Sequence, residues 1–269
     1  MSKPNETTPG SETGAAVQQD GLHTAIYTPS FLSLVYNWVV LYFNLRWMWR
    51  CRADTVLEPF FSENFSRNHL DIGVATGYFP SVALSRPFRS HARQTLVLAD
   101  LNPNPLRAAA ARILSLSSPS SSRENEKSGD KSEGNISVST VVADITLPPP
   151  PALASHAPFD SISMFNLFHC VPGGPAHKLQ SLDQYAALLS EKGVLSGCSV
   201  LGGDAATNWV NYAYVKMYNR LGIFCNWDDN KEHFEDRLRD IFDEVEITVV
   251  GMIVLFRATR PKNKLKGGE

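Results

Sequence analysis

The stretch HLDIGVATGYF, residues 69–79, decides the fold. Its first residues form a short apolar run of the kind found in buried strands, and a helical pattern begins after Gly77. Glycines at such a junction let the backbone turn sharply into a helix and pass close to a ligand. A dinucleotide-binding loop would need the spacing G-x-G-x-x-G, which Gly73, Ala75 and Gly77 do not provide. We therefore predict a strand, a ligand-binding turn and a helix, without a pyrophosphate site.

The pattern continues on both sides of this stretch. The sequence predicts strands over residues 95–100, 138–144, 159–168 and 193–201, and helices over residues 104–116 and 179–190. Because parallel strands need crossover connections, this alternation predicts a parallel sheet with helices on both faces.

The end of the chain departs from this alternation. Residues 244–251 and 252–260 form two apolar runs with only Gly251 as a break between them. Such a short connection allows only an antiparallel hairpin. We therefore expect one α/β domain, in which a mostly parallel sheet ends in an antiparallel pair.

Composition sets the domain limits. Residues 1–22 are polar and predict a disordered N-terminal arm, and residues 23–260 form the single domain. Within it, 23–60 is expected to be a helical lid and 117–137 a low-complexity insertion that is rich in serine and then charged. A basic tail, 261–269, follows.

Charge and cysteine content exclude several classes of protein. The formal net charge of the 269 residues is -2, which argues against binding nucleic acid by neutralising phosphates. The four cysteines are widely spaced, so we expect no metal site, no disulfide scaffold and a cytoplasmic protein. No secretory signal is visible. The aromatic run Phe31–Trp49 is interrupted by Asn37, Asn44 and Arg46, which favours a buried or pocket-lining helix over a membrane span.

Three predicted strands each end in an aspartate: Asp71, Asp100 and Asp144. A single aspartate at a strand end often caps a turn or a helix. Three of them at the carboxyl edge, where open α/β sheets bind ligands, indicate a shared site. Carboxylates repel anions and accept hydrogen bonds, so the ligand should offer an amino group, a vicinal diol or an exocyclic amine.

At these residues the chain resembles the class I S-adenosylmethionine-dependent methyltransferases. LDIGVATGYF, residues 70–79, is similar to their first motif, acidic-x-Gly-x-Gly-x-Gly, with Ala75 at the middle glycine. LADLNPN and VVADIT resemble the second and third motifs, and FDSISMFNLFHCVPGG resembles the fourth. The likeness covers roughly residues 25–260, and further segments such as YNRLGIFCNWDDN resemble small-molecule methyltransferases of fungal natural-product pathways.

The resemblance implies a Rossmann-like methyltransferase fold with a seven-stranded sheet, and S-adenosylmethionine as cofactor. It assigns Asp100 to the ribose hydroxyls, Asp144 to the adenine amine and Ile145 to the adenine face. Asn166 either contacts the methionine end or caps the following loop. The complete expected cofactor site is Tyr27, Asp71, Gly73, Gly77, Asp100, Leu101, Asp144, Ile145 and Asn166.

The sulfonium already activates the methyl group, so the enzyme must mainly align a nucleophile with it. A general base is needed only when the nucleophile is a hydroxyl that loses its proton. His169 is the candidate base, and the alternative is a loop histidine that orders the Pro-Gly turn. Cys170 is expected to be a small buried residue rather than a nucleophile.

Two aromatic segments lie outside the regular alternation: the run before the first strand and residues 209–227. Helical stripes of this kind form either core or pocket walls. As walls, they predict Tyr36, Trp38, Tyr212 and Met217 as substrate-binding residues for a small, apolar acceptor.

Three functions remain open at this point. The first is methyl transfer to an oxygen, nitrogen or carbon nucleophile of a small, largely apolar metabolite, by in-line displacement. The second is a cyclase or pericyclase that keeps the cofactor without using its methyl group. The third is a regulatory protein with a degenerate site, which the intact glycines and aspartates disfavour. We expect no nucleic-acid partner, and the sequence does not indicate the oligomeric state.

Overall fold

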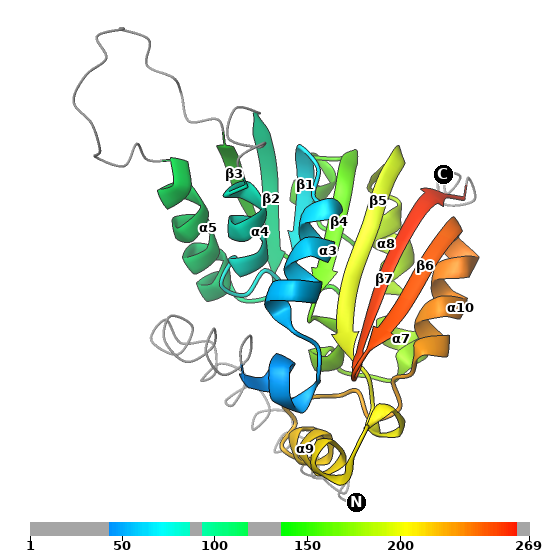
Figure 1. Cartoon of the computed structure of the whole chain (residues 1–269). Helices are drawn as coiled ribbons and strands as arrows, with labels where there is room; N and C mark the ends of the chain where they lie inside the picture. The colour runs from blue at the N-terminus through cyan, green and yellow to red at the C-terminus, as the bar shows by residue number, and fades with distance from the viewer. Residues whose placement is uncertain (1–42, 87–92, 118–135, 263–269) are drawn as a thin grey trace, which may run out of the picture.

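The computed structural model describes residues 43–86, 93–117 and 136–262. Its centre is a seven-stranded sheet with the strand order β3-β2-β1-β4-β5-β7-β6 (Figure 1). The strands are β1 (Asn68–Ile72), β2 (Gln94–Asp100), β3 (Ile136–Val142), β4 (Phe159–Phe165), β5 (Leu189–Val200), β6 (Phe242–Val250) and β7 (Ile253–Pro261). The predicted α/β sheet is confirmed.

The pairing directions follow the lengths of the connections. The strands from β3 to β5 in this order are parallel, whereas β7 is antiparallel to both β5 and β6. Gly251 takes a φ of 60° in the turn between β6 and β7, a conformation that glycine adopts without strain. The predicted hairpin is therefore confirmed. It leaves β6 as an edge strand, with the acidic side chains of Asp243, Glu244 and Glu246 exposed.

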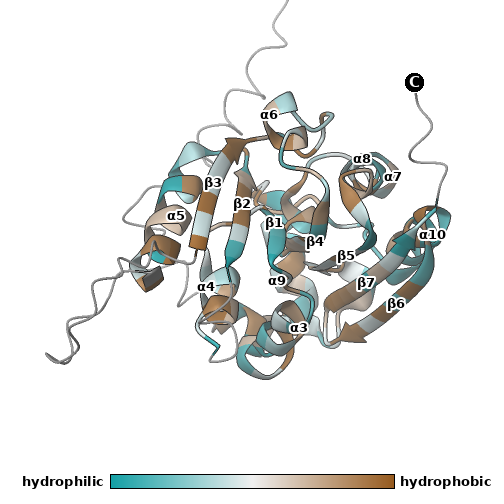
Figure 2. Ribbon diagram, turned by 90° about the horizontal axis from the view of Figure 1, so that it is seen from above, coloured by the Kyte–Doolittle hydropathy of each residue, from teal (hydrophilic) through white to brown (hydrophobic). Residues whose placement is uncertain are grey.

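Helices cover both faces of the sheet (Figures 1 and 2). One face carries α3 (Glu58–Glu63), α4 (Tyr78–Leu84) and α5 (Pro103–Ser117). The other carries α6 (Pro151–Ala154), α7 (Pro175–Lys178), α8 (Ser181–Ala186) and α10 (Lys231–Ile241). Figure 1 shows α9 (Trp209–Arg220) beyond the edge to which β4 and β5 point, whereas η2 (Ala53–Leu57) leads directly into α3.

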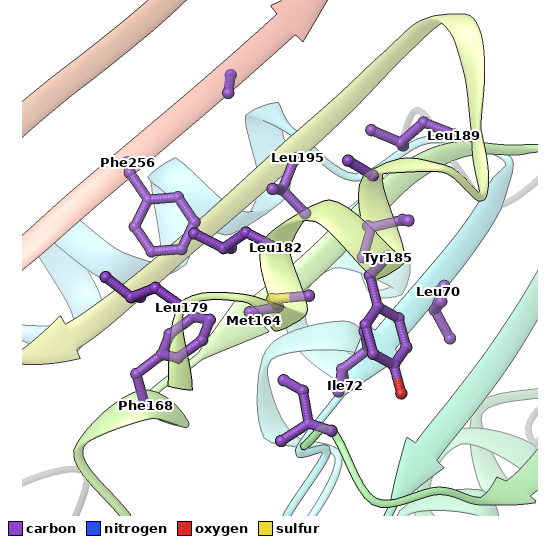
Figure 3. Close-up of a cluster of buried hydrophobic side chains, with 14 of the residues drawn as sticks. Leu70, Ile72, Met164, Phe168, Leu179, Leu182, Tyr185, Leu189, Leu195 and Phe256 are labelled. Atoms are coloured by element: carbon purple, nitrogen blue, oxygen red, sulfur yellow. The ribbon is translucent and has the colours of Figure 1, made fainter. Parts of the chain in front are cut away.

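Each face of the sheet has its own apolar core. In Figure 3, Tyr185 and Leu182 of α8 lie over Leu70, Met164 and Leu195 of the sheet. On the opposite face, Phe61, Leu106 and Ile113 belong to a second cluster, which also contains Trp49. Burying a large apolar side chain contributes about 1.5–3 kcal/mol, so these two cores hold the sheet and its helices together.

Several element boundaries differ from the sequence-based ones. The helix expected over 179–190 ends at Ala186, because Leu189 already pairs with Phe159 as the first residue of β5. The strand expected over 159–168 ends at Phe165, because Asn166 adopts a φ of 52° and turns the chain.

The expected limits of the insertion and of the tail also differ from the ends of the observed elements. Ser117 is the last residue of α5 and Ile136 begins β3, so the insertion expected over 117–137 is shorter at both ends. Pro261, expected in the tail, closes β7. The arm 1–22 and the first part of the expected lid, 23–42, lie outside the described residues.

Gly197 in the middle of β5 tests how tightly the sheet is packed. A β-carbon there would collide with the ring of Phe256 and lie 2.5 Å from the carbonyl oxygen of Met164. We expect Gly197→Ala to lower the free energy of unfolding by about 1–3 kcal/mol, measured by urea denaturation. Gly174→Ala is the matched control, because a β-carbon at that position would meet no atom within 4 Å. Equal stability of both variants would contradict this packing.

Candidate functional site

A cavity of about 580 Å³ opens at the carboxyl ends of β1, β2 and β4. This volume is in the range of small-molecule sites. The lining residues are Ile72, Gly73, Ala75, Asp100, Leu101, Asn102, Pro103, Ala143, Asp144, Ile145, Thr146, Asn166, Leu167, Cys170, Val171, Pro172, Gly222 and Cys225. The cavity therefore lies where an open α/β sheet is expected to bind its ligand.

The turn after β1 forms one wall of the cavity. Gly73 has a φ of 71°, and a β-carbon at this position would lie 2.8 Å from Cδ1 of Leu167. Ala75 also has a positive φ, 47°, which costs a residue with a side chain roughly 1–2 kcal/mol. Gly77 serves the packing of helices instead: a β-carbon there would lie 2.9 Å from Cα of Ala109 in α5. Gly73 lines the cavity, and Gly77 does not.

Two carboxylates face the cavity from neighbouring strands. Asp100 accepts a hydrogen bond of 2.9 Å from the backbone N–H of Asn102, and burial raises the pKa of its carboxyl to about 6. Asp144 lies two residues beyond the end of β3, where the backbone N–H and the hydroxyl of Thr146 donate to it at 2.8 and 2.7 Å. Both side chains are held in place while their remaining lone pairs stay available to a ligand.

The third aspartate lies deeper than its position in the sequence indicates. Asp71 is 4% exposed, accepts a hydrogen bond from the hydroxyl of Ser163, and is absent from the cavity lining. Burial, with a smaller contribution from the charge of Asp100, raises the pKa of its carboxyl to about 7. Asp71 lies one residue before the end of β1 and two residues before Gly73, so it is close to the turn that lines the cavity without lining the cavity itself.

Apolar surfaces complete the side of the cavity near the carboxylates. Ile145 is buried, whereas Leu101 is 66% exposed at the rim. Asn166 also lines the cavity; its backbone N–H donates to the carbonyl of Cys198, and its amide oxygen accepts from the thiol of that residue. Acceptor oxygens beside flat apolar walls fit a nucleoside that carries hydroxyl and amine donors, as S-adenosylmethionine does.

The structure places His169 outside the cavity lining, a position that does not favour the expected role as a general base. The side chain is buried and absent from the cavity lining, and its Nδ1 lies 3.4 Å from the backbone N–H of Val200. Burial, with a smaller contribution from Lys178, lowers the pKa of its imidazole to about 3. His169 also packs edge-on against Phe224, with 4.4 Å between the ring centroids. The His169 side chain is therefore held by β5 and Phe224, and no contact with the Pro-Gly turn of the alternative interpretation is seen among the described residues.

Of the predicted substrate residues, the two that the structure describes do not line this cavity. Tyr212 and Met217 on α9 are each 42% exposed, and neither lines the cavity. Tyr212 instead contacts Trp227, and the ammonium of Lys216 lies 5.6 Å from its ring centroid. Tyr27, Tyr36 and Trp38 lie outside the described residues.

The far end of the cavity contains residues that the sequence did not single out for binding. Cys170, Val171 and Pro172 follow β4, and Gly222 and Cys225 come from the segment after α9. The backbone N–H of Cys225 donates to the carbonyl of His169 at 2.8 Å, which ties these two segments together. The sequence signal available was the family-like stretch YNRLGIFCNWDDN, which includes Gly222 and Cys225.

Known proteins resemble this chain along nearly its whole length. No family model matches it. It is 44% identical to "O-methyltransferase NEC2" of Pyricularia oryzae over 275 residues, covering 94% of this chain and 97% of that protein. It is 35% identical to "Methyltransferase verB" of Penicillium polonicum, covering 84% of this chain and 93% of that protein. The chain belongs to this family of fungal methyltransferases.

The methyltransferase also resembles solved structures. An O-methyltransferase family protein from Burkholderia thailandensis aligns with a TM-score of 0.55 at 13% identity, over 93% of this chain and 61% of that one. The structure "PigF with SAH" aligns with a TM-score of 0.54 at 14% identity, over 88% of this chain and 62% of that one. These likenesses confirm the Rossmann-like methyltransferase fold.

The expected enzyme class and its S-adenosylmethionine cofactor are confirmed by the family. Within the described ranges, no group of three or more His, Cys, Asp or Glu side chains is arranged to hold a metal ion. None of the helices in those ranges combines the length and the hydropathy that a membrane span requires.

Replacing Asp71 tests the cost of burying its charge. Between about pH 4 and pH 7 the Asp71 carboxyl is ionised in the unfolded chain but still protonated in the folded protein. The free energy of unfolding therefore falls as the pH rises through this range. We expect Asp71→Asn to raise the free energy of unfolding of the cofactor-free protein by roughly 1–3 kcal/mol at pH 8, and to lose this gain by pH 4. Urea denaturation at several pH values measures this difference between the variant and the wild type. A gain in stability that grows towards low pH would contradict the cost assigned to the buried Asp71 charge.

Proposed function

We propose that this methyltransferase transfers the methyl group of S-adenosylmethionine to an oxygen nucleophile of a small, largely apolar natural product. The observation that carries the proposal is the division of one cavity into two ends. Asp100 and Asp144 follow β2 and β3, on one side of β1, and the small or apolar residues Cys170, Val171 and Pro172 follow β4, on its other side. Relatives named as O-methyltransferases support oxygen as the acceptor atom, among them the "Physcion biosynthesis cluster O-methyltransferase" of Aspergillus chevalieri, 32% identical over 239 residues.

The carboxylate end is assigned to the nucleoside. Asp100 accepts hydrogen bonds from the ribose hydroxyls and Asp144 from the adenine amine, while Ile145 and Leu101 contact the faces of the base. The Gly73 turn admits the methionine part close to the backbone, and Asp71 beneath it supplies negative charge for a cationic group. Asn166, directly after β4, also lines the cavity and is assigned to the methionine end of the cofactor.

The apolar end is assigned to the acceptor. When bound, the cofactor supplies a methyl group already activated by its positive sulfonium. What the chain contributes is alignment: Leu167, Val171 and Gly222 line the end of the cavity that would hold the acceptor oxygen in line with the methyl group. Holding two reactants in this way can lower the barrier by about 7–11 kcal/mol.

Neither candidate group next to this end is assigned to proton transfer. His169 is neutral and directed into the core. Burial raises the pKa of the Cys170 thiol to about 12, so it stays protonated at neutral pH. Both residues therefore serve the shape of the site.

The other functions left open by the sequence are less well supported. A cyclase that keeps the cofactor without reacting it is not favoured, because the relatives are named methyltransferases. The size of the cavity supports a small molecule as the acceptor, in preference to a nucleic acid or a peptide. We also place the enzyme in the cytoplasm, since its four cysteines are free thiols.

Asp100→Asn tests the nucleoside end. The variant keeps the shape of the side chain but loses the charge that strengthens hydrogen bonds from hydroxyl donors. We expect the dissociation constant of S-adenosylhomocysteine to rise about tenfold at pH 8, measured by titration calorimetry. Asp160→Asn is the control, because Asp160 is exposed near the start of β4, at the opposite edge of the sheet. Unchanged affinity in the Asp100 variant would refute the assignment.

Cys170 tests the acceptor end. Labelled S-adenosylmethionine and a panel of hydroxylated aromatic compounds identify an acceptor, and mass spectrometry locates the added methyl group. We then expect Cys170→Phe to raise the KM for that acceptor at least about tenfold, while the affinity for S-adenosylhomocysteine changes little, because the ring fills space at the far end. Cys170→Ala should keep most of the activity. Abolition of turnover by Cys170→Ala would assign the thiol a chemical role and contradict the proposal.

A further inference from the structure

A chain of hydrogen-bonded side chains lies behind Asp71, on the inner strands β1 and β4. His69 and Asp71 are two residues apart on β1 and therefore point to the same face of the sheet. In the parallel register, His69 is opposite Ser161 and Asp71 is opposite Ser163. The four side chains are each at most 4% exposed. Four polar groups thus share one buried strip in the centre of the sheet.

The contacts in this strip are continuous. The hydroxyl of Ser163 donates to Oδ1 of Asp71 and lies 2.9 Å from Nε2 of His69. On the other side of the ring, Nδ1 of His69 lies 2.6 Å from the hydroxyl of Ser161. Ser161 also accepts the backbone N–H of Ser66 at 2.9 Å. The chain of contacts therefore connects Asp71 to the loop before β1.

With Asp71 ionised and His69 neutral, the donor and acceptor inventory gives this chain a single direction. An ionised Asp71 can only accept, so Ser163 must use its one proton on that carboxylate. The oxygen of Ser163 must then accept from Nε2–H of His69. A neutral imidazole with its proton on Nε2 has an acceptor at Nδ1, and this nitrogen takes the proton of Ser161. Ser161 in turn accepts from the backbone N–H of Ser66. Its hydroxyl also lies 2.6 Å from the hydroxyl of Ser66, which must then donate to it, so every donor in the chain points towards Asp71.

The apolar surroundings of the chain strengthen its hydrogen bonds. The His69 ring packs against Phe61 and Phe65, with centroid distances of 5.6 and 4.4 Å, in a region where bulk water does not screen charges. The titratable groups on the neighbouring elements are Asp100 of β2, which disfavours the ionised form of Asp71, and Glu58 of α3, which accepts from the hydroxyl of Tyr78 in α4. The Ser163 hydrogen bond acts in the opposite sense and favours the ionised carboxylate.

We propose that His69 and Ser163 are positioning residues for cofactor binding: the neutral imidazole, protonated at Nε2, fixes the Ser163 hydroxyl as a donor and so keeps Asp71 charged beneath the Gly73 turn. This inference rests on the proposed function, in which Asp71 supplies negative charge to the cofactor. Protonation of Asp71 would remove that charge and leave Ser163 free to turn its proton towards Nε2 of His69. The charge of the carboxylate and the tautomer of the histidine are thereby linked.

The tautomer can be measured on the wild-type protein without cofactor. Nitrogen-15 chemical shifts of histidine distinguish a ring nitrogen that carries a proton from one that accepts a hydrogen bond. We expect His69 at pH 8 to show a protonated Nε2 and an unprotonated Nδ1. Comparison with a His69→Gln sample assigns the signal. A proton on Nδ1 at pH 8, in either the other tautomer or the imidazolium, would overturn the proposed direction of the chain.

The effect on binding is measured by titrating S-adenosylhomocysteine from pH 6 to pH 9. Ser163→Ala removes the donor to Asp71, so we expect the pH midpoint of binding to move up by about one unit, and affinity at pH 7 to fall up to about tenfold. Ser163→Thr, which restores a hydroxyl, should return the midpoint towards the wild-type value. Ser199→Ala is the control, because Ser199 is equally buried, in β5, and faces His169 instead.

The outcomes separate the two proposals. If the wild-type protein binds S-adenosylhomocysteine and Ser163→Ala binds it with an unchanged midpoint, the positioning role is wrong while the proposed function stands. If the wild-type protein binds none at any pH, the proposed function fails, and this inference fails with it. A shift in Ser163→Ala that Ser199→Ala does not share supports both.

Discussion

Keeping negative charge inside the carboxyl edge of a parallel sheet is the constraint on which the rest of this structure depends. A buried carboxylate is costly unless donors compensate it. Asp71 receives the hydroxyl of Ser163 and Asp100 receives backbone N–H groups, yet burial still raises the pKa of both carboxyls. The fold therefore holds a site whose charge is only partly neutralised. A ligand that brings a positive charge and hydrogen-bond donors supplies what is missing, which is the chemistry of the cofactor.

The strands and the two apolar cores around this edge hold the residues of the site in place. The parallel register of β1 and β4 sets Ser163 directly beside Asp71, and the aromatic core under α3 excludes water from the same strip. On the other face, the α8 core holds the strands that carry the cavity residues. The second segment of the cavity wall, around Cys225, is fixed by Lys178, whose buried ammonium donates to the carbonyl of Cys225 and pairs with Asp229 at 2.9 Å. Stability and site geometry thus depend on the same contacts.

The sequence predicted the features that follow from local pattern and the shortest connections. The strands, the closing hairpin, the Gly73 turn and the cavity positions of Asp100 and Asp144 all follow from periodicity, spacing and the resemblance. The direction in which a side chain points does not follow from such patterns. His169 lies in the right loop but turns into the core, and Tyr212 lies on a helix beyond the edge with its ring against Trp227. The depth of Asp71 and its link to His69 depend on cross-strand register, which no single segment of sequence contains.

The hairpin has a consequence for how these molecules behave at high concentration. Its outer strand β6 is at the edge of the sheet that the described residues form, and an edge strand offers another molecule a place to add a strand. Glu244 and Glu246 are exposed along it and pair with Arg260 and Arg257 of β7. A second copy approaching in register would bring like charges together and would have to disturb these ion pairs. The acidic border thus protects the enzyme against edge-to-edge aggregation.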